Sequence, residues 1–333
     1  MATAVAALDR SGSRVEADNR ARFAGSAGHV ESWFWRCNDP LAARAFWCKA
    51  TVYAPLVGLP LAQAWAIGFD GQDAFGHRDD VEIGSAQLTG SELTVARCRF
   101  GLGQESVIAG ECGELAWQLN VRAQDGPLGE PLSMFPSRLL LKGGVPKSKL
   151  LTPLPSARFD GWLQWRDQRI EVASWTGMQG HNWGKEHAAE YVWGQCLFDG
   201  AMVEALTGRI RLAGCLTPPV SALVVRTVER EWRFDALLDL WRQDAVIGDR
   251  MWTLRMRNRD ATVELTLDGS SAPFACLGYR NPDGSLRYCW NTKLARCQLV
   301  LTPAGGPAQH WQSAHGGGLE VLRPVPDENA RVV

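Results

Sequence analysis

The stretch Leu115-Ala-Trp-Gln-Leu-Asn-Val-Arg122 alternates large apolar side chains with polar or small ones, and it indicates the fold class of this 333-residue chain. Successive side chains of a β-strand point to opposite faces of a sheet, so the alternation predicts a strand with one buried face. Ala261-Thr-Val-Glu-Leu-Thr-Leu-Asp268 repeats the pattern in the second half of the chain. One-sided strands of this kind are typical of antiparallel sheets.

The same alternation extends along most of the chain, and turn dipeptides such as Asp199-Gly200 and Asp268-Gly269 separate its segments. Helical periodicity is scarce, which argues against parallel βαβ units. A long antiparallel sheet closes or stacks to protect its edges, and a barrel of about eight strands does so. We therefore predict an all-β fold of two tandem antiparallel β-barrels with little helix. Further strands are expected at 45–53, 62–69, 93–100, 105–111, 169–176, 190–198, 201–214, 221–228, 231–238 and 295–301.

The strand rhythm also predicts the domain organisation. Residues 1–22 lack periodicity and are expected to form a flexible leader. Residues 23–178 and 179–302 each hold enough strands for one barrel. Residues 303–333 are rich in Gly, Pro and Ala, including Gly316-Gly-Gly318, and predict a C-terminal tail on the surface.

The composition excludes several classes of partner. A net charge of −1 and a pI near 6.6 provide no basic field for a nucleic acid. The nine Cys are odd in number and never form a Cys-x-x-Cys pair, which argues against a disulfide framework or a zinc knuckle. The N-terminus has no basic segment before an apolar run, and no window reaches the ~18–20 apolar residues of a spanning helix. A cytoplasmic protein with at most peripheral membrane contact is expected, and its oligomeric state is left open.

Sequence motifs for cofactors are also absent. The chain has no Gly-x-Gly-x-x-Gly after a strand, no phosphate-binding loop, no His-Glu-x-x-His and no Gly-x-Ser-x-Gly. We therefore predict chemistry without a cofactor, on a hydrophobic small molecule.

Residues 175–198 concentrate polar and aromatic side chains, a mixture that favours an aromatic pocket with polar groups. The segment begins Trp175-Thr-Gly-Met-Gln-Gly-His-Asn-Trp-Gly-Lys-Glu-His187. Metal binding is an alternative, because imidazole and carboxylate groups are common ligands. However, the His-x5-His spacing matches no known metal pattern, so hydrogen-bonded imidazoles at a barrel rim are the favoured interpretation. The residues singled out here as candidates are His181, Asn182, Lys185, Glu186 and His187.

Aromatic residues in and near this segment are candidates for substrate binding. Tyr191, Trp193 and Gln195 share one face of a predicted strand. Trp175 and Trp183 either line a cavity with Trp193 or fill it.

Glu31 lies on an early predicted strand, on the same face as Trp33 and Trp35. If that face points into a barrel, burial beside two indoles raises the pKa of the Glu31 carboxyl above its ordinary value of about 4.3. A carboxyl of this kind suits general-acid catalysis. The alternative is a Glu that pairs with an Arg at the barrel mouth.

Three segments together carry a family resemblance: His29-Val-Glu-Ser-Trp-Phe-Trp-Arg-Cys-Asn-Asp-Pro40, Ala45-Phe-Trp-Cys-Lys-Ala-Thr-Val-Tyr-Ala-Pro55 and Gly180-His-Asn-Trp-Gly-Lys-Glu-His187. They resemble the carotenoid 1,2-hydratase (hydroxyneurosporene synthase)-like family, which is similar in turn to AttH-like proteins, tocopherol cyclases and some fungal Diels–Alderases. The resemblance spans about residues 25–302. It implies two lipocalin-like (calycin) β-barrels in tandem.

Two classes of function follow as hypotheses. The first is an enzyme that hydrates or cyclises an apolar isoprenoid or polyene, or promotes a pericyclic reaction on it. Glu31, Glu186 and His187 are the candidate acids, with His181 and Asn182 as orienting groups and Trp faces stabilising a carbocation. The second is a non-catalytic lipocalin-like carrier of a hydrophobic small molecule. A further alternative places the working surface at the interface between the barrels.

Overall fold

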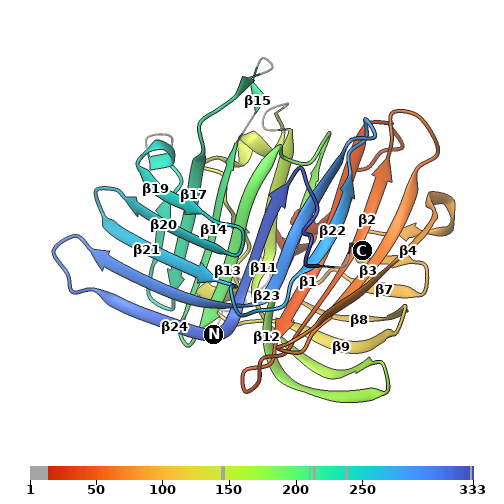
Figure 1. Cartoon of the computed structure of the whole chain (residues 1–333), viewed down its shortest axis with the longest axis horizontal. Helices are drawn as coiled ribbons and strands as arrows, with labels where there is room; N and C mark the ends of the chain where they lie inside the picture. The colour runs from red at the N-terminus through yellow and green to blue at the C-terminus, as the bar shows by residue number, and fades with distance from the viewer. Residues whose placement is uncertain (1–13, 144–146, 210, 213–214, 237–238, 331) are drawn as a thin grey trace, which may run out of the picture.

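The computed structural model describes residues 14–143, 147–209, 211–212, 215–236, 239–330 and 332–333. It confirms the all-β prediction: two curled antiparallel sheets lie side by side, each with the curvature of half a barrel (Figure 1). Helix is limited, in the described part, to residues 14–19 and to short 3-10 turns. These turns are Ile83–Ser85, Pro127–Gly129, Arg138–Leu141 and Asp239–Trp241.

The first sheet has the strand order β4-β3-β2-β1-β12-β11-β9-β8-β7-β6-β5, with β10 paired to β11. Its strands are β1 (His29–Asn38), β2 (Ala45–Ala54), β3 (Leu61–Phe69), β4 (Ala74–Glu82), β5 (Gln87–Leu88), β6 (Glu92–Val95), β7 (Cys98–Gly101), β8 (Glu105–Cys112), β9 (Leu115–Ala123), β10 (Leu132–Ser133), β11 (Ser148–Trp165) and β12 (Gln168–Gly184).

The second sheet has the order β18-β17-β14-β13-β24-β23-β21-β20-β19, with β22 paired to β23. Its strands are β13 (Glu190–Phe198), β14 (Ala201–Arg209), β17 (Val220–Thr227), β18 (Glu231–Phe234), β19 (Gln243–Ile247), β20 (Met251–Arg257), β21 (Ala261–Asp268), β22 (Ala275–Arg280), β23 (Leu286–Pro303) and β24 (Gln309–Arg323). A separate ribbon pairs β15 (Arg211–Leu212) with β16 (Cys215–Leu216).

Apolar side chains fill the concave interior of each sheet. On β9, Leu115, Trp117, Leu119 and Val121 are buried, while the residues between them are half-buried or exposed. This is the predicted alternation, and it gives each sheet an apolar core of its own. A third apolar cluster lies outside both interiors, where the two sheets meet.

That meeting zone, called the seam from here on, has β1, β2 and β3 on one side and β22 and β23 on the other. Figure 1 shows β1 and β23 side by side there. Strand β2 shows how the seam arises: Cys48 and Ala50 belong to the first interior, while Trp47 belongs to the seam cluster. Because both faces of β2 are covered by protein, the whole strand is buried.

The change from one sheet to the other occurs in residues 185–189. The predicted boundary between residues 178 and 179 falls inside β12, which continues to Gly184 in the first sheet. In the structure Gly180 allows close packing, since a Cβ atom there would lie 2.2 Å from the Phe34 ring.

The prediction of a C-terminal surface tail is wrong for most of this segment. Residues 309–323 form β24, which pairs with β13 and β23 in the middle of the second sheet. The glycines that suggested an irregular surface segment serve close packing here: a Cβ atom on Gly317 would lie 2.7 Å from the Ala295 carbonyl oxygen. Composition therefore gave the wrong structure for this segment.

The predicted flexible leader is also corrected for the residues that the structure describes. Residues 14–19 form a helical turn, and Val15 joins the core of the first sheet. Asp18 and Asn19 are buried, and the Asn19 carbonyl oxygen accepts a 3.0 Å hydrogen bond from the Trp33 indole. Residues 1–13 lie outside the described residues.

Candidate functional site

Glu31 on β1 and His181 on β12 form a buried pair inside the first sheet, and both side chains are 0% exposed. His181 Nε2 lies 2.9 Å from Glu31 Oε1, and His181 Nδ1 lies 2.6 Å from the Asp18 carbonyl oxygen. The Trp33 indole stacks on the imidazole at 4.7 Å. The pair therefore ties the N-terminal segment to the sheet.

The predicted rise in the pKa of Glu31 is corrected. Burial does raise the pKa, but hydrogen bonds from His181 and His29 outweigh it and bring the pKa to about 2. The backbone amides of Arg22 and Phe23 each donate a further 2.8 Å hydrogen bond to the carboxylate. An anion held by so many donors is a structural anchor and a poor general acid.

Other predicted residues of the His181 segment are scattered. Glu186 forms a surface ion pair with Lys147 at 3.1 Å, and Lys185 is exposed. Asn182 is half-buried in β12. Trp183 is also half-buried, and the Arg22 guanidinium lies over its ring, 5.1 Å from the ring centre. Trp35 and Trp175 belong to the apolar core of the first sheet.

Tyr191 and Trp193 of β13 belong to the apolar cluster at the seam, and Gln195 of the same strand contacts the first sheet. The Trp193 indole donates a 3.0 Å hydrogen bond to Glu204, whose pKa is raised by burial. Gln195 donates to the Pro155 carbonyl at 2.7 Å and accepts a hydrogen bond from Arg36. The hydrogen bonds of Gln195 therefore join the second sheet to the first.

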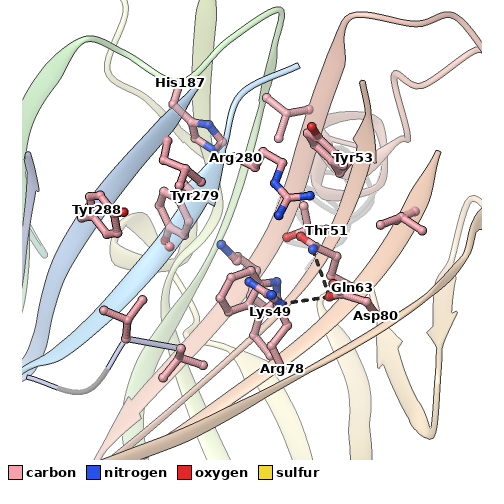
Figure 2. A pocket seen from close by; sticks show the side chains of 17 residues that line it. Lys49, Thr51, Tyr53, Gln63, Arg78, Asp80, His187, Tyr279, Arg280 and Tyr288 are labelled. Carbon is pink, nitrogen blue, oxygen red and sulfur yellow. Dashed lines mark hydrogen bonds and ion pairs between the residues drawn. The ribbon is translucent and has the colours of Figure 1, made fainter. Parts of the chain in front are cut away.

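A cavity of about 320 Å³ opens in the seam (Figure 2). On β2, the side chains that line it alternate with those that fill the first interior, so the cavity lies outside that interior. Its lining includes Lys49, Thr51 and Tyr53 of β2, Trp65 of β3, Tyr279 and Arg280 of β22, and His187 from the segment that joins the sheets.

Lys49 is an unusually buried lysine: it is 4% exposed, and its amine is surrounded by aromatic rings. Lys49 Nζ lies 3.9 Å from the centre of the Tyr279 ring, 4.5 Å from Trp65 and 5.4 Å from Trp47. Burial lowers the pKa of Lys49 to about 7. The amine therefore exists in both protonation states near neutral pH.

Charged groups on several strands act on Lys49. Glu320 on β24 raises its pKa, while Arg78 on β4 and Lys293 on β23 lower it. Lys293 is itself held by Glu320 at 2.6 Å. The Glu320 carboxylate is therefore already paired with another amine.

His187 lies beside the same tyrosine, and its ring stacks on Tyr279 at 4.9 Å. Its Nδ1–H donates to Asn281 Oδ1 at 3.0 Å, which leaves Nε2 as an acceptor. Burial, followed by the charge on Lys49, lowers the pKa of His187 to about 4. The imidazole is therefore neutral at neutral pH. Of the predicted catalytic residues, His187 is the one that lines the cavity.

The sequence prediction missed Lys49, Tyr279 and Arg280. Lys49 carried a signal that was not used, since it interrupts an apolar aromatic strand at a position that shares a face with Trp47. Tyr279 and Arg280 carried no local signal.

Within the described ranges, no three His, Cys, Asp or Glu side chains are grouped so as to hold a metal ion. No helix in the described part of the chain is long and apolar enough to cross a membrane.

Comparison with known proteins supports the fold assignment. No protein-family profile matches the chain. Two Mycobacterium tuberculosis proteins, from strains CDC 1551 and H37Rv, are 27% identical to it over 93% of this chain and 92% of theirs, and both are described only as uncharacterized.

Two solved structures share the architecture. One is a Nitrosomonas europaea protein provisionally named AttH, with 13% identity, a TM-score of 0.56 and coverage of 89% of this chain and 92% of that one. The other is kievitone hydratase from Nectria haematococca, with 9% identity, a TM-score of 0.56 and coverage of 87% and 88%. The chain thus has the fold of these proteins, in agreement with the predicted tandem architecture.

Proposed function

We propose that this protein is a hydratase that acts without a cofactor on a small substrate with an apolar body. The reaction adds water across a carbon–carbon double bond that an oxygen-bearing group polarises. The observation that carries the proposal is the arrangement of Lys49 and His187 in one cavity, with the Tyr279 ring between them (Figure 2).

His187 is suited to activate the water. Its Nδ1–H is held by Asn281, so Nε2 carries the lone pair that accepts a proton from water. The hydroxide portion then bonds to the electrophilic carbon of the substrate.

Lys49 is suited to stabilise the charge that this addition creates. With a pKa of about 7, its ammonium group is a good hydrogen-bond donor to a developing enolate and then a proton donor to it. Loss of that proton also removes the positive charge that lowers the pKa of His187. The His187 imidazolium then transfers the proton that it took from water to the neutral Lys49 amine. Both residues are back in their starting states, and the net change is one water added to one double bond.

The charge pattern favours a polarised double bond over the isolated alkene expected from the sequence. Protonation of an isolated alkene requires a strong acid in the cavity. The one side-chain carboxyl among the described lining residues, Asp80, forms an ion pair with Arg78 and accepts a hydrogen bond from Gln63, each at 3.0 Å. Asp80 is therefore engaged by these two partners, and the remaining proton donors suit the stabilisation of an oxyanion.

The fold comparison adds support for the reaction class. Kievitone hydratase is a hydratase by name, and its fold covers most of this chain. At 9% identity the substrate does not transfer with the fold.

The proposal is tested by incubating the protein in ¹⁸O-labelled water with two sets of compounds. The first set contains aromatic α,β-unsaturated ketones and acids, and the second contains isoprenoid alkenes and polyenes without a conjugated oxygen. Mass spectrometry should detect labelled hydrates from the first set. Lys49→Met and His187→Gln should each lower the rate by at least about 100-fold, whereas Lys142→Met, at an exposed site outside the cavity, should not.

Tight binding of these compounds without any labelled product would favour the carrier hypothesis and refute the enzyme. Labelled product from the second set alone would refute the proposed role of the polarising oxygen.

A further inference from the structure

We propose that the seam cavity recognises a carboxylate on its ligand, and that Arg280 is the group that binds it. This inference names the substrate class of the proposed hydratase and depends on that proposal only for its link to catalysis. The ligand would have an aromatic or apolar body and one acidic group.

The first observation is the position of Arg280. It is the last residue of β22 and lines the cavity, and Figure 2 shows its guanidinium group extending toward Thr51 on the opposite wall. In the described part of the chain no carboxylate lies within ion-pair distance of Arg280. The carboxylate of Asp80, on the same cavity wall as Thr51, is held by Arg78 and Gln63.

The second observation is the charge balance of the lining. Three cationic side chains, Lys49, Arg78 and Arg280, share the cavity with one side-chain carboxylate, Asp80. The pair between Arg78 and Asp80 leaves buried Lys49 and exposed Arg280 without a side-chain carboxylate within ion-pair distance among the described residues. A ligand carboxylate would fill that role, because the planar guanidinium of Arg binds a carboxylate through two parallel hydrogen bonds.

The third observation is the apolar surface beside these cations. Trp65 and Tyr279 are buried, with exposed fractions of 2% and 8%, and their ring faces lie next to Lys49. Aromatic faces bind an apolar ligand body, whereas a small inorganic anion has no apolar surface to place against them. The combination therefore favours an aromatic or apolar acid over a free inorganic anion.

The experiment compares 2-naphthoate with 2-naphthamide, which has the same ring system and no charge. Isothermal titration calorimetry on the full chain should show that 2-naphthoate binds at least about tenfold more tightly. Arg280→Gln should abolish this preference while leaving the affinity for 2-naphthamide unchanged. Arg259→Gln provides a matched control, because Arg259 is 92% exposed and does not line the cavity.

Equal affinity for the two ligands, binding of neither at millimolar concentration, or a preference that survives Arg280→Gln would overturn the inference. Thermal denaturation of Arg280→Gln establishes that the variant is folded, so a lost preference reflects the missing guanidinium. The hydration assay is independent of this result. A preference for the acid without any hydration would refute the proposed reaction and leave the carboxylate site intact.

Discussion

The amine of Lys49 lies 3.9 Å from the centre of the Tyr279 ring, and this contact joins the two sheets across the seam. Lys49 belongs to β2 of the first sheet and Tyr279 to β22 of the second. The positive charge is balanced mainly by ring faces, which stabilise a cation less than a carboxylate does. The contact therefore leaves a reactive amine on the wall of a cavity that neither sheet forms alone.

Lys49→Met should stabilise the folded chain at pH 6.5. The pKa of Lys49 is about 7 in the folded state and about 10.4 in an unfolded chain. Between these values the unfolded state binds more protons, so stability rises with pH, and below pH 7 the full cost of the buried ammonium is present. We expect a gain of about 1–3 kcal/mol in the free energy of unfolding, since cation–π contacts offset part of that cost.

Urea unfolding of Lys49→Met and the parent chain at pH 6.5 and 9.5 measures this gain. It should shrink at the higher pH, where the folded amine is already neutral. A gain that is the same at both values would show that the pKa of Lys49 is not lowered.

His187→Gln should make the chain less sensitive to acid. The pKa of His187 is about 4 in the folded state and about 6.5 unfolded. The unfolded state therefore binds an extra proton between these values, and stability falls as the pH drops through this window. The loss between pH 7.5 and 4.5, measured by urea unfolding, should be about 2 kcal/mol smaller in the variant.

His310→Gln is the matched control for this experiment, because His310 is exposed on β24. It should leave the loss between the two pH values unchanged. An unchanged loss in His187→Gln as well would contradict a lowered pKa of the half-buried imidazole at residue 187.

Glu31→Gln should destabilise the chain by about 3 kcal/mol at pH 7, because the amide leaves buried donors without an anionic partner. The pKa of Glu31 is about 2, so this stabilisation is present above pH 4.5 and is lost as the pH falls toward 2. Limited proteolysis should also cut residues 14–23 faster in the variant. Glu186→Gln, which removes a surface ion pair, should change stability by less than about 0.5 kcal/mol. Equal effects of the two substitutions would contradict the anchor role of Glu31.

Leu319→Ala should show that β24 is part of the core. Leu319 is 0% exposed and packs in the interior of the second sheet. Truncation of a fully buried Leu costs about 2–5 kcal/mol. Chemical denaturation should reveal this cost, while Gln312→Ala at an exposed position of the same strand should stay within about 0.5 kcal/mol. A negligible effect of Leu319→Ala would contradict the core position of β24 and favour the predicted surface tail.

The structural role of glycine was the feature that the sequence predicted least well. Gly317, within Gly316-Gly-Gly318, was read as part of a surface tail, because glycine is common in turns and irregular segments. In the structure Gly317 instead permits close contact with the Ala295 carbonyl inside β24, at an irregular point of its pairing with β23. A glycine that avoids a clash and a glycine that allows a turn look the same in one sequence.

The sequence by itself determined that the chain is built from antiparallel strands. The alternation at residues 115–122 and 261–268 is local, and a strand converts it directly into one buried and one solvated face. Only the tertiary structure decided the site. Lys49, His187 and Tyr279 are far apart in the sequence, and alternation tells which residues share a face without telling which faces of two sheets meet. The pKa of Glu31 was misjudged for the same reason: burial was foreseeable, but the backbone amides and imidazoles that hold its charge come together only in the folded chain.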